Sequence, residues 1–241
     1  MKFSLILACL IVASAEALSS PNRPDDIVDI KKVIPNIDLD IRYFSQRNFL
    51  GVVVDSYYAP KCFLHKKAAQ SLKQAQETLR ESGLKILIHD CYRPQSAVDH
   101  FIRWAKDLND LKMKNVFYPE VKKNDLFSSG YIASRSGHSR GSTIDLSILQ
   151  QNAVLKNITK LSLKDCRKPV PKIAKKLGML EMGTNYDCFD SLSHTANPKI
   201  SEEAQDNRKI LKEAMEKVGF KNYSKEWWHY SYRNEAYPKT Y

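Results

Sequence analysis

Apolar side chains recur at three- and four-residue intervals along residues 65–83, which predicts a helix with one buried face that Gly83 ends. The apolar positions of this helix are Ala68, Ala69, Leu72, Ala75 and Leu79. A similar pattern predicts a second helix over residues 94–108, with Pro94 at the first position, where proline is tolerated. Both apolar faces need a packing partner in the fold.

The clearest helix pattern covers residues 201–219. Ser201 can cap the first turn, and the acidic Glu202 and Glu203 suit the positive end of a helix. Gly219 stands where the apolar periodicity stops, so we expect the helix to end there.

Three other stretches predict strands. Residues 84–89 are largely apolar, residues 142–148 alternate between apolar and polar, and residues 225–233, which read KEWWHYSYR, are rich in aromatic side chains. The chain has neither regular strand–helix alternation nor a glycine-rich phosphate loop. We therefore predict an α+β fold in which helices pack on an antiparallel sheet.

Two further segments bear on domain organisation. Residues 18–40 predict an extended lead-in, and residues 149–180 form a basic segment with weak periodicity. We interpret the basic segment as an insertion at the surface rather than as a second domain. The sequence then predicts a single domain over residues 18–241.

The N-terminus has the pattern of a secretory signal peptide over residues 1–17. Lys2 supplies a positive end, residues 3–13 form an apolar run, and small residues alternate around Ala15. A membrane anchor is the alternative, but this run spans only about half of a bilayer core. No other stretch is long and apolar enough to cross a membrane, so we expect a secreted or periplasmic protein.

Export changes the interpretation of the cysteines. Without Cys9, four remain, and an even number in an oxidising compartment suggests disulfides. Three pairings are possible, and buried free thiols are the alternative. We predict Cys62–Cys91 and Cys166–Cys188, because each pair encloses a modest loop.

The formal net charge is +11, and removal of Lys2 and Glu16 with the signal leaves it unchanged. An exported protein meets little nucleic acid, so we predict no nucleic-acid partner. Anionic polymers of the cell envelope, including peptidoglycan fragments, suit this charge better. The lysines are spread apart from residues 156–176, so a solvated basic surface explains most of the charge.

Residues 134–146, SRSGHSRGSTIDL, carry the first candidate chemistry. Here a histidine in a predicted turn, His138, precedes an aspartate in a predicted strand, Asp145, and both side chains are good zinc ligands. A third ligand is needed, and His229 is the best candidate. A lone His138 is more often an ordinary core or surface histidine, so the metal site depends on all three.

KEWWHYSYR also carries Glu226, which could take a proton from a metal-activated water. In an extended strand Glu226 and His229 point to opposite faces, so both reach one metal only if the strand twists or bulges, or if a water bridges. Arg93 in HDCYRP could stabilise an oxyanion, although an Asp90–Arg93 ion pair could be merely structural. The two tryptophans are interpreted as packing residues.

Three motifs taken together, SGHSRGSTIDL, EWWHY and DCYRP, resemble the zinc D-alanyl-D-alanine dipeptidases of the vancomycin-resistance type, in peptidase family M15. The likeness continues in DIRYFSQRNFLG, MGTNYDCFDSLSH and EAQDNRKILKEAMEKVGFKNYSKEWWHY, and so covers most of the chain after the signal in the same order. It implies a zinc site of the hedgehog and D-Ala-D-Ala peptidase kind, with the catalytic domain in residues 18–241.

The resemblance implies that one Zn²⁺ per chain is held by His138, Asp145 and His229. It makes Glu226 the catalytic base and then the acid, and Arg93 the group that stabilises the tetrahedral oxyanion.

The same resemblance implies a small closed pocket that holds both ends of a dipeptide. Tyr43 and Asp187 match the positions that bind the free ammonium group, and Ser136 and Tyr131 match those near the free carboxylate. Charged ends in a tight site need partners, and a longer peptide would leave those partners unpaired. A disulfide between Cys166 and Cys188 would staple the basic insertion beside this pocket.

We therefore expect an exported zinc-dependent dipeptidase that hydrolyses D-alanyl-D-alanine or a similar D,D-dipeptide. One alternative is a zinc D,D-carboxypeptidase or endopeptidase that trims peptidoglycan stem peptides, against which Tyr43 and Asp187 argue because they would hold a free amino end. The other is a zinc-binding module without catalysis, against which the presence of Glu226 and Arg93 argues.

Overall fold

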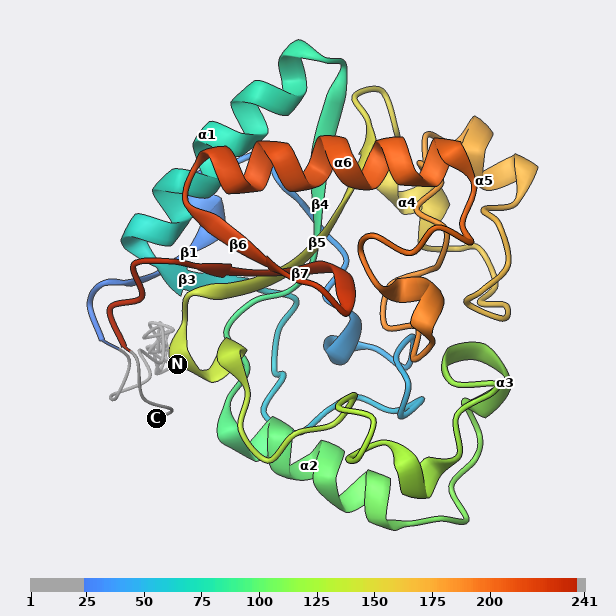
Figure 1. The fold of residues 1–241 in the computed structure, drawn as a ribbon. Coiled ribbons are helices and arrows are strands. Elements are labelled where there is room, and N and C mark those ends of the chain that lie inside the picture. The colour runs from blue at the N-terminus through green and yellow to red at the C-terminus, as the bar shows by residue number, and fades with distance from the viewer. Residues whose placement is uncertain (1–23, 238–241) are drawn as a thin grey trace, which may run out of the picture.

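The computed structural model describes residues 24–237, so the predicted signal peptide, residues 1–17, lies outside the described part (Figure 1). One sheet has the strand order β2-β4-β5-β7-β6. Its strands are β2 (Asp38–Leu39), β4 (Leu84–Asp90), β5 (Thr143–Gln150), β6 (Phe220–Tyr223) and β7 (Glu226–Tyr232). The last four pair antiparallel, whereas the two-residue edge strand β2 runs parallel to β4. The predicted α+β fold is confirmed, and its antiparallel sheet has one short parallel edge.

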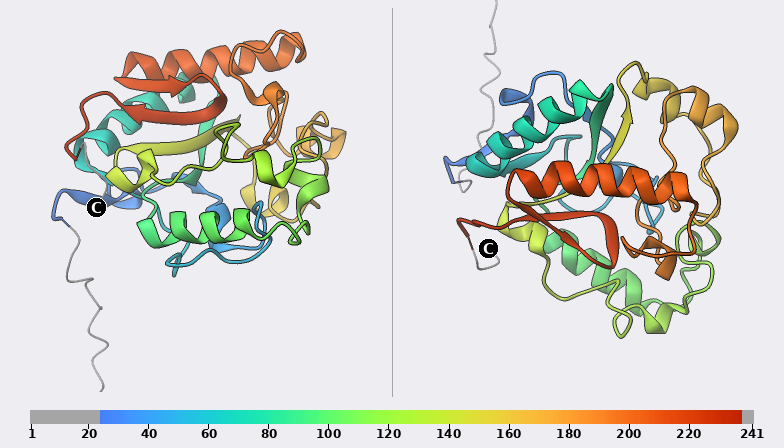
Figure 2. Two further views of the ribbon diagram at one scale, coloured as in Figure 1. Left: turned by 60° about the horizontal axis from the view of Figure 1, so that its bottom comes forward. Right: turned by 45° about the horizontal axis from the view of Figure 1, so that its top comes forward.

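The three predicted helices form on two sides of this sheet. α1 (Lys66–Glu81) and α6 (Glu202–Lys217) contact each other and cover one face, and α2 (Gln95–Lys106) lies on the other side (Figures 1 and 2). The loops that carry the candidate site run between the sheet and α2 (Figure 1). Short helices at one end are α3 (Lys114–Phe117), α4 (Leu155–Ile158) and α5 (Lys172–Lys176).

The helix boundaries agree with the local chemistry. Gly83 and Gly219 have φ values of 72° and 92° just after α1 and α6, a backbone conformation that glycine adopts without strain. Ser201 caps α6, because its Oγ accepts a hydrogen bond from the backbone N–H of Ala204. α2 begins one residue later than predicted, so Pro94 lies directly before its first helical residue.

Two regions differ in detail from the sequence prediction. β6 was not predicted, because it is a four-residue strand directly after a helix and Phe220 is its one buried residue. The described part of the lead-in, residues 24–40, is less extended than predicted. It forms β1 (Ile27–Asp29), a 3₁₀ turn and β2, and β1 pairs antiparallel with β3 (Phe63–His65).

Both predicted disulfides are present, Cys62–Cys91 and Cys166–Cys188. The first joins the residue before β3 to the residue after β4. The second joins the basic segment to the loop that follows it. Between residues 24 and 237, no helix has the length and apolar character needed to cross a bilayer.

A buried arginine ties α6 to the loop that carries Asp187. Arg208 is 1% exposed, and its guanidinium donates hydrogen bonds to the carbonyl oxygens of Met182, Leu192 and His194 at 2.6–2.9 Å. Burial lowers its pKa to about 10, so it stays charged near neutral pH. Without this side chain, three carbonyl groups would lose a charged donor.

We therefore expect Arg208→Met to lower the free energy of unfolding by about 3 kcal/mol, measured by urea denaturation. Lys209→Met, on the exposed side of the same helix, is the matched control, since its side chain is 71% exposed. The control should change stability by less than about 0.5 kcal/mol. Equal effects of the two substitutions would show that Arg208 does not anchor the loop.

Candidate active site

Three neighbouring strands place one polar residue each in a row across the sheet. Asp90 of β4 pairs with Asp145 of β5, which pairs in turn with His229 of β7. Directly opposed residues point to the same face of a sheet, so the three side chains meet on one side. Strand register thus gathers residues that are far apart in the sequence.

His138 reaches the same place from the turn before β5. This 3₁₀ turn, Gly137–Arg140, begins where Ser136 Oγ accepts a hydrogen bond from His138 N at 3.2 Å. It ends at Gly141, whose φ is 72°. His138 Nδ1 donates to the carbonyl oxygen of Cys91 at 2.7 Å, which leaves the lone pair of Nε2 free to face the site.

A bulge in β7 brings Glu226 and His229 to the same side. On β6, Asn222 pairs with Tyr230, but the next residue, Tyr223, pairs with Glu226. The β7 residues in between therefore leave the pairing with β6, although His229 stays paired with Asp145 of β5. Asn222 Nδ2 holds this bulge by donating to the carbonyl oxygens of Glu226 at 3.0 Å and His229 at 3.1 Å. Glu226 Oε2 consequently lies 3.5 Å from His229 Nδ1.

His138, Asp145 and His229 form a cluster that could hold a metal ion, with one ligand atom from each within 4.8 Å of the others. His138 Nε2 lies 3.2 Å from Asp145 Oδ2 and 3.3 Å from His229 Nδ1. Asp145 Oδ1 is buried and accepts no hydrogen bond within the described chain, although His229 Nδ1 is 3.0 Å away. An orphaned carboxylate oxygen beside two imidazole nitrogens fits a divalent cation such as Zn²⁺.

Arg93 pairs with both aspartates of the row. Its Nε donates to Asp90 Oδ2 at 2.9 Å, and its Nη2 lies 3.6 Å from Asp145 Oδ2. Tyr57 donates to the other oxygen of Asp90 at 2.6 Å. The Asp90–Arg93 ion pair is therefore real, and the same guanidinium also lines the cleft.

Glu226 has the properties of a proton acceptor that works near neutral pH. Burial raises its pKa to about 7; His229 opposes this shift, and Asp145 adds to it. Trp227 and Trp228, the next two residues, are 2% and 1% exposed and shield this part of the site from water. In contrast, His138 and His229 hold the pKa of Asp145 well below its usual range, although burial opposes them.

These residues surround a cleft of about 260 Å³. Every predicted site residue except Asp187 lines it: Tyr43, Arg93, Tyr131, Ser136, His138, Asp145, Glu226 and His229. Tyr131 stacks on Phe189 with a centroid separation of 5.0 Å, and so forms one wall.

Asp187 lies behind this cleft rather than in its wall. Tyr43 donates a hydrogen bond from its hydroxyl to Asp187 Oδ2 at 2.8 Å and is itself among the residues that line the cleft. Burial, and then the charge of Asp145, raise the pKa of Asp187 well above its ordinary value. The two predicted ammonium-binding residues are thus in contact, with Tyr43 in front.

Some supporting residues carry no clear signal in the sequence. Tyr186 donates from its hydroxyl to Asp145 Oδ2 at 3.1 Å. Trp227 Nε1 donates to Thr184 Oγ1 at 2.8 Å, which joins the bulge to the loop of Asp187. These two contacts cross between distant segments, whereas those of Asn222 stay within the β6–β7 hairpin. In each case only the place of the residues inside the matched motifs could have pointed to the contact.

A cation-binding cluster beside a glutamate that can accept a proton is the arrangement with which metallopeptidases cleave peptide bonds. The fold and this site place the chain among the metallopeptidases. The model of peptidase family M15, described as D-ala-D-ala dipeptidase, matches residues 23–157 and 172–241. The chain belongs to this family.

Similar proteins are found in several bacteria. A D-alanyl-D-alanine dipeptidase of Enterococcus faecalis is 34% identical over 212 residues, covering 88% of this chain and 94% of that protein. One of Streptomyces coelicolor is 33% identical over 90% of this chain and 96% of its own length. One of Escherichia coli is 26% identical over 88% of each chain.

The bulge yields a prediction. Asn222→Ala removes the amide that holds the carbonyl groups of Glu226 and His229, so we expect the affinity for Zn²⁺ to fall about tenfold, as for other supporting contacts of metal ligands. Competition with a fluorescent zinc chelator measures this. Lys221→Ala, at an exposed position on the same strand, should leave the affinity unchanged. An unchanged affinity in Asn222→Ala would mean that the bulge forms without the amide.

Proposed function

We propose that this protein is an exported zinc dipeptidase that hydrolyses D-alanyl-D-alanine or a similar D,D-dipeptide. The observation that carries the proposal is the position of Glu226, whose carboxylate lies 3.5 Å from the ligand atom of His229 and faces the same cleft as Arg93. The names of the relatives support the substrate class. The N-terminal signal pattern and the two disulfides support export.

Zn²⁺ held by His138, Asp145 and His229 would supply a readily deprotonated water and polarise the peptide carbonyl. Glu226 accepts the proton of the attacking water, and its pKa of about 7 leaves a substantial ionised fraction at neutral pH. The guanidinium of Arg93 stabilises the negative charge that develops on the carbonyl oxygen. Glu226 then returns its proton to the leaving amine.

The family resemblance assigns the polar residues of the cleft to the two ends of a free dipeptide. Tyr43, backed by Asp187, binds the ammonium group, whereas Ser136 and Tyr131 lie toward the carboxylate. A peptide extended at either end would leave one of these polar groups buried without its partner, which is a strong basis for selection. The small volume of the cleft, about 260 Å³, agrees with a short substrate.

Glu226→Gln tests the mechanism. The variant should retain one Zn²⁺ per chain, but its kcat on D-alanyl-D-alanine should fall about 10³-fold because the proton acceptor is gone. His138→Ala should lose both metal and turnover. Glu213→Gln, whose side chain is 67% exposed on α6, is the control and should match the parent protein. Full activity in Glu226→Gln would exclude the proposed base.

A peptide panel tests the substrate class. We expect hydrolysis of D-alanyl-D-alanine, inhibition by chelator with recovery on adding Zn²⁺, and no hydrolysis of L-alanyl-L-alanine. N-acetyl-D-alanyl-D-alanine and a stem pentapeptide should react at least about 100-fold more slowly, because each lacks the free amino group next to the cleaved bond. Faster cleavage of the pentapeptide would instead identify a D,D-carboxypeptidase.

A further inference from the structure

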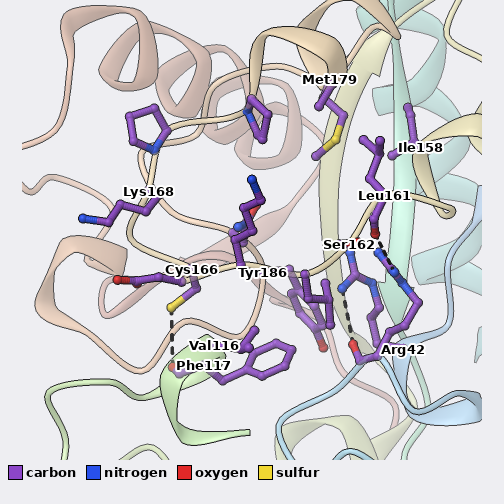
Figure 3. A pocket seen from close by; sticks show the side chains of 18 residues that line it. Arg42, Val116, Phe117, Ile158, Leu161, Ser162, Cys166, Lys168, Met179 and Tyr186 are labelled. Atoms are coloured by element: carbon purple, nitrogen blue, oxygen red, sulfur yellow. Dashed lines mark hydrogen bonds between the residues drawn. The ribbon is translucent and has the colours of Figure 1, made fainter.

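Cys166 belongs to a segment, residues 158–171, that the family match leaves out. Within this segment only Ile158 and Cys166 have buried side chains. A pocket of about 80 Å³ lies beneath it, with Cys166 and Tyr186 among its lining residues (Figure 3). Hydrophobic packing therefore holds the segment weakly, and its attachment depends on specific bonds.

Two of those bonds join Cys166 to the loop of the predicted amino-end site. The carbonyl oxygen of Cys166 accepts a hydrogen bond from the backbone N–H of Asn185 at 2.8 Å. Its sulfur is bonded to Cys188. Asn185 and Cys188 flank Tyr186 and Asp187, so a single residue of the segment fixes both sides of this pair.

Cys166 is itself held in place by two contacts with the backbone of α3. Its backbone N–H donates to the carbonyl oxygen of Val116 at 2.8 Å, and its sulfur lies 3.5 Å from that of Phe117 (Figure 3). The next residue beyond the disulfide, Phe189, donates its backbone N–H to the same carbonyl of Phe117 at 2.8 Å. The disulfide thus links two segments that both bond to the backbone of α3.

Asp187, which lies between these fixed points, has a backbone conformation that needs support from its surroundings. Asp187 has a φ of 60°, a left-handed conformation that a non-glycine residue keeps only when its surroundings hold it. In this conformation its Oδ2 accepts the hydrogen bond from Tyr43. Rotation of the loop backbone would withdraw the carboxylate that orients Tyr43 in the cleft.

We propose that the Cys166–Cys188 disulfide positions Asp187, and through it Tyr43, so that the segment 158–171 sets the affinity for the free amino group of the substrate. This inference rests on the proposed dipeptidase function. Neither cysteine touches the substrate, so the two are positioning residues.

The test uses two ligands that differ by one group. D-alanyl-D-alanine has the free amino group, and N-propionyl-D-alanine is the same molecule with hydrogen in its place. In the double variant Cys166→Ala/Cys188→Ala, KM for the dipeptide should rise about tenfold, as expected when a charged hydrogen bond is weakened, with kcat within about twofold. The inhibition constant of N-propionyl-D-alanine should stay unchanged.

Two further variants separate positioning from general loosening. Cys62→Ala/Cys91→Ala removes the other disulfide and should not discriminate between the two ligands. Ser193→Ala keeps both disulfides but removes the hydroxyl that donates to the carbonyl oxygen of Cys188 at 2.7 Å. It should raise KM in the same selective way, by about threefold, and it decides the question if the double cysteine variant does not fold.

Equal weakening of both ligands, or an unchanged KM in folded variants with an active parent enzyme, would overturn this inference alone. A parent enzyme that does not hydrolyse D-alanyl-D-alanine would reject the proposed function and this inference with it.

Discussion

Asp90, Asp145 and His229 lie in one row across β4, β5 and β7, and the rest of the site is built around that row. A shift of either strand pair by one residue would turn one of these side chains to the opposite face of the sheet. The row also sets two carboxylates directly opposite each other in a buried place, which costs free energy unless a cation lies between them. Arg93 meets that need for both aspartates, so the same guanidinium serves the fold and the cleft.

Two irregular stretches of backbone around this row place side chains that regular strands would not bring into the site. The turn Gly137–Arg140 turns His138 into the site, and the bulge of β7 sets Glu226 beside His229. Ser136 Oγ holds the turn by accepting a hydrogen bond from His138 N, and Asn222 holds the bulge by donating two. The tryptophans after Glu226 pack in the core, and Trp227 also bonds to the loop of Asp187. The candidate metal ligands, Glu226 and the predicted amino-end residues thus belong to one connected network.

Periodicity predicts what depends on local sequence. The helices α1, α2 and α6 and the strands β4, β5 and β7 follow directly from apolar spacing and end residues. Motif resemblance adds the residues of the cleft, which the structure brings together. The spacing of Glu226 and His229 calls for a twist, a bulge or a bridging water. It does not choose among them, because the bulge depends on Asn222 of β6, a strand that the pattern does not predict. The place of Asp187 behind Tyr43 is equally invisible, since a left-handed backbone and a contact with a distant loop decide it.

The central claim is that a single zinc ion and the two ends of a D,D-dipeptide share this cleft. Anomalous diffraction at the zinc edge, from crystals of Glu226→Gln protein soaked with D-alanyl-D-alanine, tests it most directly. We predict one zinc peak bounded by His138, Asp145 and His229, with the peptide carbonyl next to Arg93 and the amino group at Tyr43. A zinc peak elsewhere, or a dipeptide with its carboxylate at Tyr43, would contradict the account.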